Sequence, residues 1–483
     1  MKMYRRSLAL LTDLYELTMA YGYWKLGITG KHATFCLYFR EHPFHGGFSV
    51  ACGLGAVIEY LREIHFDDDD LAYLATLTGG DGQPLFESGF LDYLRALEFA
   101  LDVDAIPEGT VVFPREPLVR VRGPILPAQI LESALLNLIN FQTLIATKAA
   151  RVCLAARGDA VIEFGLRRAQ GVDGGVSASR AAYVGGCDAV SNTLAGRLFD
   201  IPVKGTHAHS WVMAFDSELE SFHGYARALP NNCIFLVDTY HTLDGVRHAV
   251  EVGKSLRAQG HQLAGIRLDS GDLAYLSIEA RKILDAAGFP DAVIVASNEL
   301  DEYLIESLKE QGAAINVWGV GTKLATAYDQ PALGGVYKLT SLRPPDGVWE
   351  PKIKLSEQVI KINIPGQLQV RRYRGEDGFI GDMIYEETLG IQQPVIIDPT
   401  DPSRHKALPA DVPTEDLLVP IFRNGRQVYD IPPLADSRAR TQQQLAHLHP
   451  SIKRFIHPHE YPVGLEPALA DLRNRLIVEA RGG

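Results

Sequence analysis

From about residue 150 onward, short apolar runs rich in β-branched residues alternate with amphipathic helical stretches. The spacing predicts strands at residues 160–164, 201–204, 233–237, 263–268, 292–296 and 314–318. It also predicts helices at 243–259, 273–287 and 301–311, each stopped by a glycine, namely Gly260, Gly288 and Gly312. Because β-α units of this kind pack their strands in parallel, we expect an α/β fold.

The predicted strands run into polar or glycine residues where they end. These residues are Thr206 and His209, Asp238 and Thr239, Asp269 and Asp272, Asn298, and Gly319 and Gly321. Barrel enzymes place their sites at the C-terminal ends of the strands, and open doubly wound sheets do so too. Of these two architectures we expect an irregular TIM-like α/β barrel, with its site at this end of the strands.

The segments on either side of this pattern have a different character. Residues 1–125 mix helices with short strands, which predicts an α+β N-terminal domain ahead of a barrel domain at 126–342. Beyond residue 343 the rhythm gives way to short alternating runs and turns, followed by a helix at 465–480. We expect this C-terminal segment, 343–483, to pack back on the N-terminal domain.

Three local features are interpreted as structural rather than functional. Four successive aspartates, Asp67 to Asp70, cannot converge on one metal ion, so we expect them to begin a helix at its positive end. The apolar stretch 133–147 contains three amides and is shorter than the roughly 20 residues that span a membrane, which predicts a buried core helix. Arg5-Arg6 precede an apolar run that acidic residues soon interrupt, so no signal peptide is expected.

The charge balance restricts the partners of the chain. Its 47 basic and 59 acidic side chains give a net charge of −12, and this field repels nucleic acids and anionic membranes. An anionic substrate must therefore be held by a few local Arg, Lys and backbone N–H groups. The five cysteines are scattered and form no Cys-x-x-Cys pair, which is typical of reduced thiols in the cytoplasm.

The sequence Gly-Thr-His-Ala-His-Ser at 205–210 places two histidines on one face of an extended strand end. One interpretation is a zinc site, since His-x-His at a barrel strand end supplies two imidazoles to the metal. Another is a phosphorylatable histidine, because a neutral ring nitrogen can attack the terminal phosphorus of ATP. Packed or surface histidines are the third, and the motif alone does not choose among them.

Two further motifs carry charges or glycines suited to anions. In Arg-Leu-Asp-Ser-Gly-Asp at 267–272, Arg267 could grip a carboxylate, Asp269 or Asp272 could hold a ribose hydroxyl or Mg²⁺, and Asp272 could equally cap the next helix. Gly-Val-Gly-Thr-Lys at 319–323 is a strand-to-helix turn that suits a phosphate, although such glycines are often purely conformational.

A pair of adjacent arginines follows the first predicted strand of the alternating pattern. Arg167 and Arg168 lie within Gly-Leu-Arg-Arg-Ala-Gln-Gly at 165–171. Facing a site, they would suit pyrophosphate or a carboxylate; on the surface, they would form ordinary salt bridges.

Read in order, these motifs resemble one family, nicotinate phosphoribosyltransferase. The resemblance also takes in Leu-Thr-Asp-Leu-Tyr-Glu-Leu-Thr-Met at 11–19, Gly-Gly-Val-Tyr-Lys-Leu at 334–339, Lys-Leu-Ser-Glu at 354–357 and His-Pro-His-Glu-Tyr at 457–461. It therefore covers nearly the whole chain. It implies an irregular barrel of the type II phosphoribosyltransferase kind and a homodimer in which each subunit contributes to the other's site.

The resemblance also implies an activity and a set of site residues. Nicotinate and phosphoribosyl pyrophosphate would give nicotinate mononucleotide and pyrophosphate on the route to NAD, with Mg²⁺ (or Mn²⁺) on the phosphates and ATP hydrolysed through a phosphohistidine. By position, His209 resembles the phosphorylated histidine. Nicotinate contacts would come from Tyr15, Thr206, Arg267 and Arg167, and phosphoribosyl contacts from Thr322, Gly319, Gly321, Asp269 and Asn298. The metal ligands are left open.

Two alternative functions compete with this one. A barrel hydrolase would use His207, His209 and either Asp238 or His241 around zinc. A nucleotide-binding or regulatory protein could keep the fold without turnover, although the intact polar strand ends argue against that. The presence of His207 beside His209 also leaves open which imidazole takes the phosphate, and His209 is preferred because Ser210 and Trp211 follow it as the family pattern requires.

Overall fold

The computed structural model describes residues 7–482, so the Arg5-Arg6 pair lies outside the described residues. The fold divides into two compact units. One unit covers Leu144–Pro331, and the other combines the chain up to Thr143 with the chain from Ala332 onward. Each unit is described by itself.

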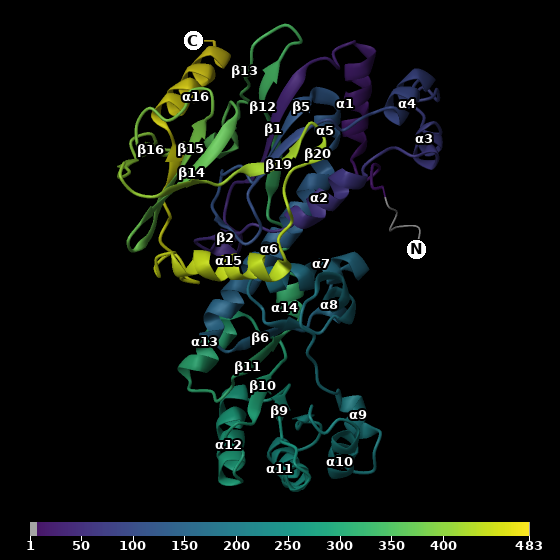
Figure 1. Cartoon of the computed structure of the whole chain (residues 1–483), viewed down its shortest axis with the longest axis vertical. Coiled ribbons are helices and arrows are strands. Elements are labelled where there is room, and N and C mark those ends of the chain that lie inside the picture. Colours follow the sequence, from purple (N-terminus) through teal and green to yellow (C-terminus); the bar gives the residue numbers. More distant parts are fainter. Residues whose placement is uncertain (1–6, 483) are drawn as a thin grey trace. The chain divides into compact units, whose positions relative to one another are not determined.

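The unit at Leu144–Pro331 is built on a parallel sheet (Figure 1). Within residues 7–482 this sheet has six strands in the order β7-β6-β11-β10-β9-β8, and every pairing in it is parallel. The strands are β6 (Ala160–Glu163), β7 (Ala189–Val190), β8 (Ile234–Leu236), β9 (Gly265–Leu268), β10 (Val293–Ala296) and β11 (Val317–Val320). The predicted α/β class with an irregular arrangement of parallel strands is confirmed.

Helices connect these strands in the predicted rhythm. They are α7 (Gly171–Val184), α8 (Thr193–Phe199), α9 (His209–Met213), α10 (Glu218–Ala228), α11 (Thr242–Ala258), α12 (Leu273–Ala286), α13 (Glu302–Glu310) and α14 (Thr322–Ala325). Gly260, Gly288 and Gly312 follow α11, α12 and α13 with φ of 83°, 81° and 77°, the left-handed conformation that ends a helix. Asp272 caps α12 by accepting a hydrogen bond from Tyr275 N–H, as one of its two predicted roles required.

One predicted strand, 201–204, is wrong as a strand. Its only pairing is an isolated bridge between Val203 and Val190, which belongs to the two-residue strand β7. The neighbouring Pro202 accepts a hydrogen bond from Val190 N–H but has no N–H of its own, so the ladder does not extend. The strand was predicted at 201–204 because of its β-branched residues. Strand β7 was not predicted because it has only two residues and no such pattern.

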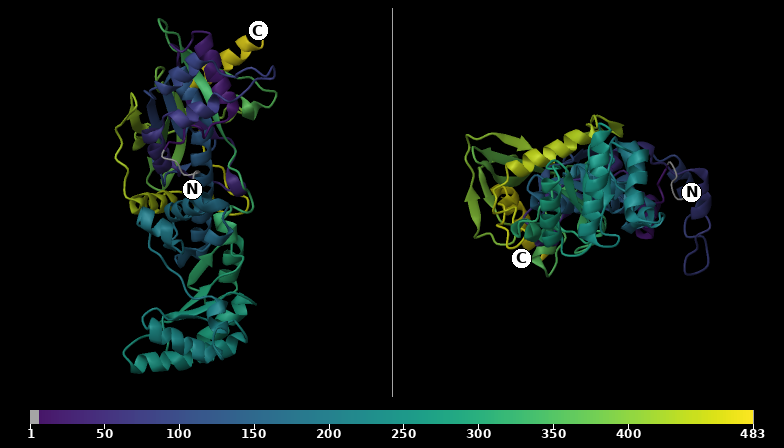
Figure 2. Two further views of the ribbon diagram at one scale, coloured as in Figure 1. Left: turned by 90° about the vertical axis from the view of Figure 1, so that its right-hand side faces the viewer. Right: turned by 90° about the horizontal axis from the view of Figure 1, so that it is seen from below.

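The other unit combines the two ends of the chain. Within residues 7–482 one sheet has the order β13-β12-β1-β5-β3-β19-β20 and a second has the order β17-β16-β21-β15-β14-β18. Figures 1 and 2 show the C-terminal elements, coloured yellow-green, beside the purple N-terminal ones in this unit. Since β19 of the C-terminal segment pairs with β3, the predicted return of this segment onto the N-terminal domain is confirmed.

The strands of this unit are β1 (His32–Phe39), β2 (Ser49–Val50), β3 (Asp102–Ala105), β4 (Val111–Val112), β5 (Val119–Pro124), β12 (Gly335–Arg343), β13 (Glu350–Pro351), β14 (Leu368–Gly375), β15 (Gly378–Glu386), β16 (Val395–Ile397), β17 (His405–Ala407), β18 (Thr414–Asp416), β19 (Val419–Arg423), β20 (Arg426–Gln427) and β21 (Val463–Leu465). Its helices are α1 (Leu14–Lys25), α2 (Leu54–Glu63), α3 (Asp68–Leu74), α4 (Ser88–Arg95), α5 (Ile125–Ile130), α15 (Leu434–Ala446) and α16 (Pro467–Ala480). Helix α6 (Glu132–Ala156) runs from this unit into the other. The three-domain division at residues 125 and 342 stays a prediction.

Two of the features interpreted as structural have that role. Asp67 and Asp70 form a reciprocal capping box at the start of α3, so the aspartate run begins a helix as predicted. Within residues 7–482 one helical run, Ile125–Ala156, has the length and apolar character of a membrane span. Its most apolar window is 61% buried inside the protein, in agreement with the predicted core helix.

Candidate active site

Four of the predicted strand-end residues, Asp269, Asn298, Gly319 and Gly321, line one cleft of the parallel-sheet unit. The cleft contains about 480 Å³ of empty space, part of it open to solvent, at the C-terminal ends of β6, β11, β10 and β9. Its lining consists of Phe164, Arg167, Arg168, Arg267, Asp269, Ser297, Asn298, Glu299, Gly319, Gly321 and Thr322. Seven of the predicted site residues are among them: Arg167, Arg267, Asp269, Asn298, Gly319, Gly321 and Thr322. Phe164, Ser297 and Glu299 were missed by the sequence analysis.

Arg267 organises the centre of the cleft. It lies on β9, where its Nε donates to Ser297 Oγ at 2.9 Å and its Nη1 donates to Thr206 Oγ1 at 3.0 Å. Its Nη2 donates to Asp269 Oδ1 at 2.8 Å, and its guanidinium carbon lies 5.8 Å from the centre of the Phe164 ring. Nη1 also donates to His207 O at 3.4 Å, so four of the five N–H donors of Arg267 are used and the remaining donor has a defined direction. The predicted site residues Thr206, Arg267 and Asp269 are thus brought together.

The Asp269 carboxylate is held in its charged form by its neighbours. Burial alone would raise the pKa of Asp269, but hydrogen bonds from Ser297 and Arg267 outweigh burial and hold the pKa below its usual range. The backbone N–H of Asp269 donates to Asp238 Oδ2 at 2.8 Å, which fixes the strand end that carries it. Oδ1 takes the hydrogen bonds from Arg267 and Ser297, so Oδ2 is the oxygen left for other groups.

His209 lies beside this carboxylate. Its side chain is 41% exposed at the start of α9, with Nδ1 3.1 Å from Thr239 Oγ1 and Nε2 3.8 Å from Asp269 Oδ2. With Nδ1–H donating to the Thr239 hydroxyl, Nε2 keeps its lone pair. The imidazole is therefore oriented and reachable, which is what a nucleophilic histidine needs.

His207 has the opposite environment. Its residue is only 7% exposed, and its ring lies among Phe222, Tyr225 and Phe235 with centroids 4.9 to 6.3 Å away. Its Nε2 accepts a hydrogen bond from Leu236 N–H at 3.3 Å. Burial lowers the pKa of His207 to about 4, so the ring is neutral. Both the packing and the occupied Nε2 remove His207 from chemistry at the cleft.

The geometry does not assemble the zinc site of the alternative hydrolase. No group of three or more His, Cys, Asp or Glu side chains in the described part of the chain is arranged to hold a metal ion. Asp238 uses Oδ2 to accept hydrogen bonds from Asp269 N–H and the Ser270 hydroxyl. His241 pairs instead with Asp244 at 3.1 Å on an exposed turn. His207 and His209 are therefore not arranged to bind one metal ion.

Close backbone approach explains the glycines of the β11 turn. A Cβ at Gly319 would lie 2.6 Å from the Phe164 ring, so a side chain there would displace this ring from the cleft. Thr322 begins α14 directly after the turn and lines the cleft. Lys323, in contrast, turns away to an ion pair with Asp301 at 2.5 Å. The threonine, and not the lysine, is the turn's contribution to the cleft.

The cleft also contains residues with strained backbone conformations and arginines that have no ion-pair partner within residues 7–482. Asn298 and Glu299 have φ of 83° and 39°, a left-handed conformation that costs non-glycine residues energy and recurs at functional sites. Arg167 and Arg168 are exposed, and among the described residues neither forms an ion pair or a side-chain hydrogen bond. Unpaired guanidinium groups facing a cleft are suited to an anion.

Tyr15 lies in the other unit, on α1, with 46% of its surface exposed. Burial of the hydroxyl and the nearby Glu132 and Glu16 carboxylates raise its pKa above the usual range. Its predicted contact with nicotinate stays a prediction.

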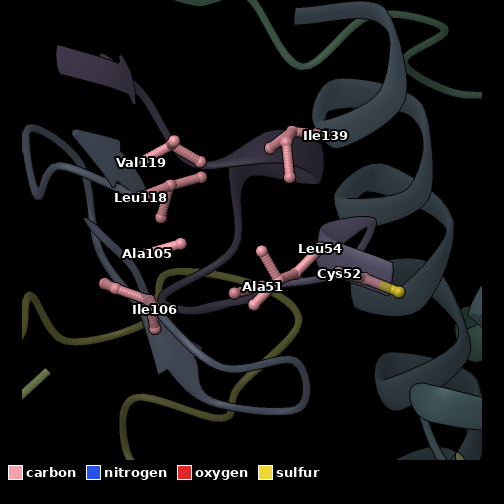
Figure 3. Close-up of a pocket in the computed structure, with 8 residues that line it drawn as sticks. All are labelled: Ala51, Cys52, Leu54, Ala105, Ile106, Leu118, Val119 and Ile139. Carbon is pink, nitrogen blue, oxygen red and sulfur yellow. The ribbon is translucent and has the colours of Figure 1, made fainter. Parts of the chain in front are cut away.

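A second pocket, in the unit formed by the chain ends, has a different character (Figure 3). It encloses about 220 Å³ of empty space and is lined by Ala51, Cys52, Leu54, Ala105, Ile106, Leu118, Val119 and Ile139. No charged side chain lines it, so it cannot neutralise a phosphate or a carboxylate. The polar cleft at the sheet is the better candidate for an anionic substrate.

Comparison with known proteins agrees with this geometry. Residues 10–140 match the N-terminal domain of nicotinate phosphoribosyltransferase (NAPRTase), residues 160–346 match the NAPRTase family, and residues 368–473 match the C-terminal domain of nicotinate phosphoribosyltransferase. The chain is 44% identical over 467 residues to nicotinate phosphoribosyltransferase of Bacillus subtilis, covering 95% of this chain and 93% of that protein. It is 36% identical over 538 residues to the Homo sapiens enzyme, covering 97% and 96%.

Solved structures show the same relationship. The crystal structure of human nicotinic acid phosphoribosyltransferase superimposes with a TM-score of 0.84 at 34% identity, covering 96% of this chain and 99% of that one. Nicotinate-nucleotide pyrophosphorylase from Pyrococcus furiosus shares the fold with a TM-score of 0.69 at 22% identity. On the strength of the sequence identity, its extent and the matching fold, the chain belongs to the nicotinate phosphoribosyltransferase family and is an enzyme with that activity.

Proposed function

We propose that the cleft at β6, β9, β10 and β11 is where nicotinate meets phosphoribosyl pyrophosphate, and that ATP drives the reaction by phosphorylating His209. One observation carries the proposal. The Asp269 carboxylate contacts Arg267 through Oδ1 and lies 3.8 Å from His209 through Oδ2, so one residue joins the anion-binding arginine to the accessible histidine.

Arg267 and Thr206 would bind the nicotinate carboxylate. A guanidinium has five N–H donors, and Arg267 uses four of them on Ser297 Oγ, Thr206 Oγ1, His207 O and Asp269 Oδ1. The fifth donor remains for a ligand carboxylate. The Thr206 hydroxyl, which donates to His207 O at 3.3 Å in this structure, would turn to the carboxylate when nicotinate binds. A neutral amide lacks the charge that this guanidinium stabilises, so nicotinamide is expected to bind less well.

The pyridine ring would pack on aromatic side chains. Phe164 lines the cleft and lies beneath Arg267, which places an apolar face next to the carboxylate-binding group. Tyr15 is proposed as a second ring contact, on the basis of the family resemblance. With its carboxylate and ring fixed, the nicotinate nitrogen would face the anomeric carbon of the ribose.

The phosphoribosyl group would lie along the turn after β11 and beside Asn298. Thr322, Gly319 and Gly321 would hold a phosphate through a hydroxyl and close backbone approach, and Asn298 would contact the sugar. Glu299, which the sequence analysis missed, adds a carboxylate suited to a ribose hydroxyl. The family resemblance implies a nicotinate contact for Arg167. We assign Arg167, together with Arg168, to the pyrophosphate instead, because Arg267 already offers a guanidinium to the nicotinate carboxylate and the pyrophosphate has the highest charge density of the substrate.

Positioning and charge stabilisation would supply most of the catalysis. The ring nitrogen of nicotinate has a free lone pair, so it attacks the anomeric carbon without a strong base while the bond to pyrophosphate breaks. The charge that grows on the departing pyrophosphate is then met by the arginine pair and the backbone N–H groups. No residue of the chain needs to form a bond to the sugar.

The cleft also contains donors of the kind that Mg²⁺ (or Mn²⁺) accepts. Asp269 Oδ2 and the Glu299 carboxylate are hard oxygen ligands, and Mg²⁺ usually combines one or two carboxylates with substrate phosphates. These two residues would hold the metal. When bound, the metal would neutralise phosphate charge and help the pyrophosphate to leave.

His209 would couple ATP to this reaction. Its Nε2 lone pair attacks the γ-phosphorus of ATP, the new N–P bond forms, and the bond to the ADP oxygen breaks. Thr239 holds the Nδ1 side of the ring during this step. Later transfer of the phosphoryl group to water regenerates the imidazole. The chain is further proposed to act in the cytoplasm, as its scattered cysteines indicate, and as a homodimer, as the family resemblance implies.

The experiment that tests the proposed function is product analysis by mass spectrometry. Pure protein is incubated with Mg²⁺ and phosphoribosyl pyrophosphate, offered either nicotinate or nicotinamide, with and without ATP. The proposal predicts nicotinate mononucleotide in an amount that ATP increases, and much less of the amide product. An absence of mononucleotide from both bases would contradict it.

A further inference from the structure

Glu163 is a buried carboxylate at the edge of the cleft that the proposed reaction does not use directly. It is the last residue of β6, and only 1% of its surface is exposed. One oxygen, Oε1, accepts a hydrogen bond from the backbone N–H of Gly165, two residues later. The other, Oε2, accepts one from the Ser179 hydroxyl at 2.8 Å. Both oxygens therefore have a hydrogen-bond partner.

The partners of Glu163 extend into a buried polar network. Ser179, on α7, also contacts Gly175 O at 2.9 Å. Asn192 donates from Nδ2 to Ser179 Oγ and Gly175 O, both at 3.3 Å, and its Oδ1 caps α8 through two backbone N–H groups. The carboxylate thus joins the end of β6 to two helices of the same unit.

The turn that Glu163 holds carries the free positive charge of the cleft. Residues 164–168 include Phe164 and the exposed, unpaired Arg167 and Arg168. The turn packs closely on its neighbours: a Cβ on Gly165 would lie 2.3 Å from Ala325 Cβ and 2.8 Å from Gly321 O. The backbone N–H of Phe164 is also bound, to Val320 O at 2.8 Å. A small shift at Gly165 would therefore displace both arginines.

We infer that Glu163 is a positioning residue whose carboxylate fixes the 164–168 turn so that Arg167 and Arg168 meet the pyrophosphate of phosphoribosyl pyrophosphate. The inference rests on the proposed function of the cleft. Phosphoribosyl pyrophosphate carries several negative charges near its pyrophosphate, whereas nicotinate carries one and already has Arg267. Displacement of the arginine pair is thus expected to weaken the binding of phosphoribosyl pyrophosphate more than the binding of nicotinate.

The chemistry of the residue fits this role. A buried carboxylate is costly unless its oxygens are hydrogen-bonded, and here each oxygen has a donor that the fold supplies. Burial raises the pKa of Glu163 above its usual range, and the hydrogen bonds from Ser179 and Gly165 offset only part of this rise. Removing the side chain would leave the Gly165 N–H unpaired, and the turn would lose its anchor to α7.

Steady-state kinetics with four variants tests the inference. Glu163→Ala removes both acceptors and is expected to raise KM for phosphoribosyl pyrophosphate about tenfold. Glu163→Gln keeps an acceptor for Gly165 N–H and is expected to keep this KM within about twofold of wild type. Ser179→Ala removes one contact of Oε2, and an increase of about threefold is expected. KM for nicotinate is expected to stay within about twofold in every variant.

Ser277→Ala is the matched control, because Ser277 is also buried on a helix, α12, but its hydroxyl contacts Ala274 O and Ala314 N–H. It is expected to leave KM for phosphoribosyl pyrophosphate unchanged. If Glu163→Ala does not fold, the comparison of Ser179→Ala with Ser277→Ala decides. The inference would be overturned if Ser179→Ala and Ser277→Ala had the same KM for phosphoribosyl pyrophosphate. It would also be overturned if Glu163→Ala raised KM for nicotinate and for phosphoribosyl pyrophosphate equally. A wild-type chain without product would instead refute the proposed function.

Discussion

The buried His207 gives the parallel-sheet unit a predictable dependence on pH. Burial lowers the pKa of His207 from 6.5 to about 4, so the folded state disfavours the proton that the unfolded chain accepts. The stabilisation from the neutral ring is complete above pH 6.5, falls as the pH drops from 6.5 toward 4, and does not change further below 4. A shift of this size corresponds to about 3 kcal/mol in total, of which about 2.5 kcal/mol is lost by pH 4.5.

The substitution His207→Gln isolates this effect, because glutamine is neutral at every pH. Hydrogen exchange of the Leu236 amide is the local readout, since this N–H donates to His207 Nε2. Corrected for intrinsic exchange, the opening free energy at Leu236 is expected to fall by about 2.5 kcal/mol between pH 7.5 and 4.5 in the wild type. In His207→Gln the fall is expected to be under about 1 kcal/mol.

Two results would refute the reasoning about His207. Equal pH dependence in the wild type and His207→Gln would show that other groups cause the loss of stability. A larger loss in His207→Gln would mean that the wild-type ring gains a favourable partner when protonated. Phe222, Tyr225 and Phe235 offer no carboxylate to such a cation, so this outcome contradicts the packing around the ring.

Two further predictions concern the cleft itself. Arg267→Lys keeps the charge but loses the planar guanidinium that contacts Ser297, Thr206 and Asp269 together. In steady-state kinetics, kcat/KM for nicotinate is therefore expected to fall about 100-fold. A change of less than threefold would contradict this prediction. Chelation of divalent cations is expected to abolish mononucleotide formation, and addition of Mg²⁺ or Mn²⁺ is expected to restore its rate. Full activity in the presence of the chelator would rule out the proposed metal.

Much of the cleft could be predicted from the sequence because of the parallel sheet. The C-terminal ends of parallel strands meet at one edge, so residues as distant in sequence as Arg167, Arg267 and Thr322 converge once the strands are recognised. The same reasoning brought Asp269 to Arg267. Thr206 also contacts Arg267, although the strand predicted before it forms only an isolated bridge. The periodicity of the sequence indicates the order of the β-α units, and this order is enough to predict which strand ends lie together.

The residues that were missed have no comparable signal. Phe164 ends an apolar run, where a phenylalanine ordinarily indicates core packing, and only the neighbouring Gly319 makes room for its ring in the cleft. Glu299 faces the cleft because the backbone is left-handed at that position, which its sequence does not indicate. Ser297 is one short hydroxyl at a strand end, and its role depends on the distance to Arg267.

The two histidines show the same limit. On an extended strand end His207 and His209 share a face, and the motif alone left both available. In the fold, His207 is enclosed by aromatic rings while His209 remains 41% exposed beside Thr239 and Asp269. The difference arises from α9, which begins at His209 and takes its ring away from the extended geometry. Tertiary packing, which the local sequence does not specify, separates a core residue from a candidate nucleophile.

The central claim is that His209 carries the phosphoryl group that couples ATP to the reaction at the cleft. The most direct measurement is mass spectrometry of the wild-type protein after incubation with ATP and Mg²⁺, with digestion at neutral to alkaline pH, where phosphohistidine survives. Fragment ions of the peptide that contains both histidines distinguish their positions. A phosphoryl group on His209, with none on His207, is the expected result. Phosphate on His207, or none on either residue while ATP still accelerates product formation, would contradict the account.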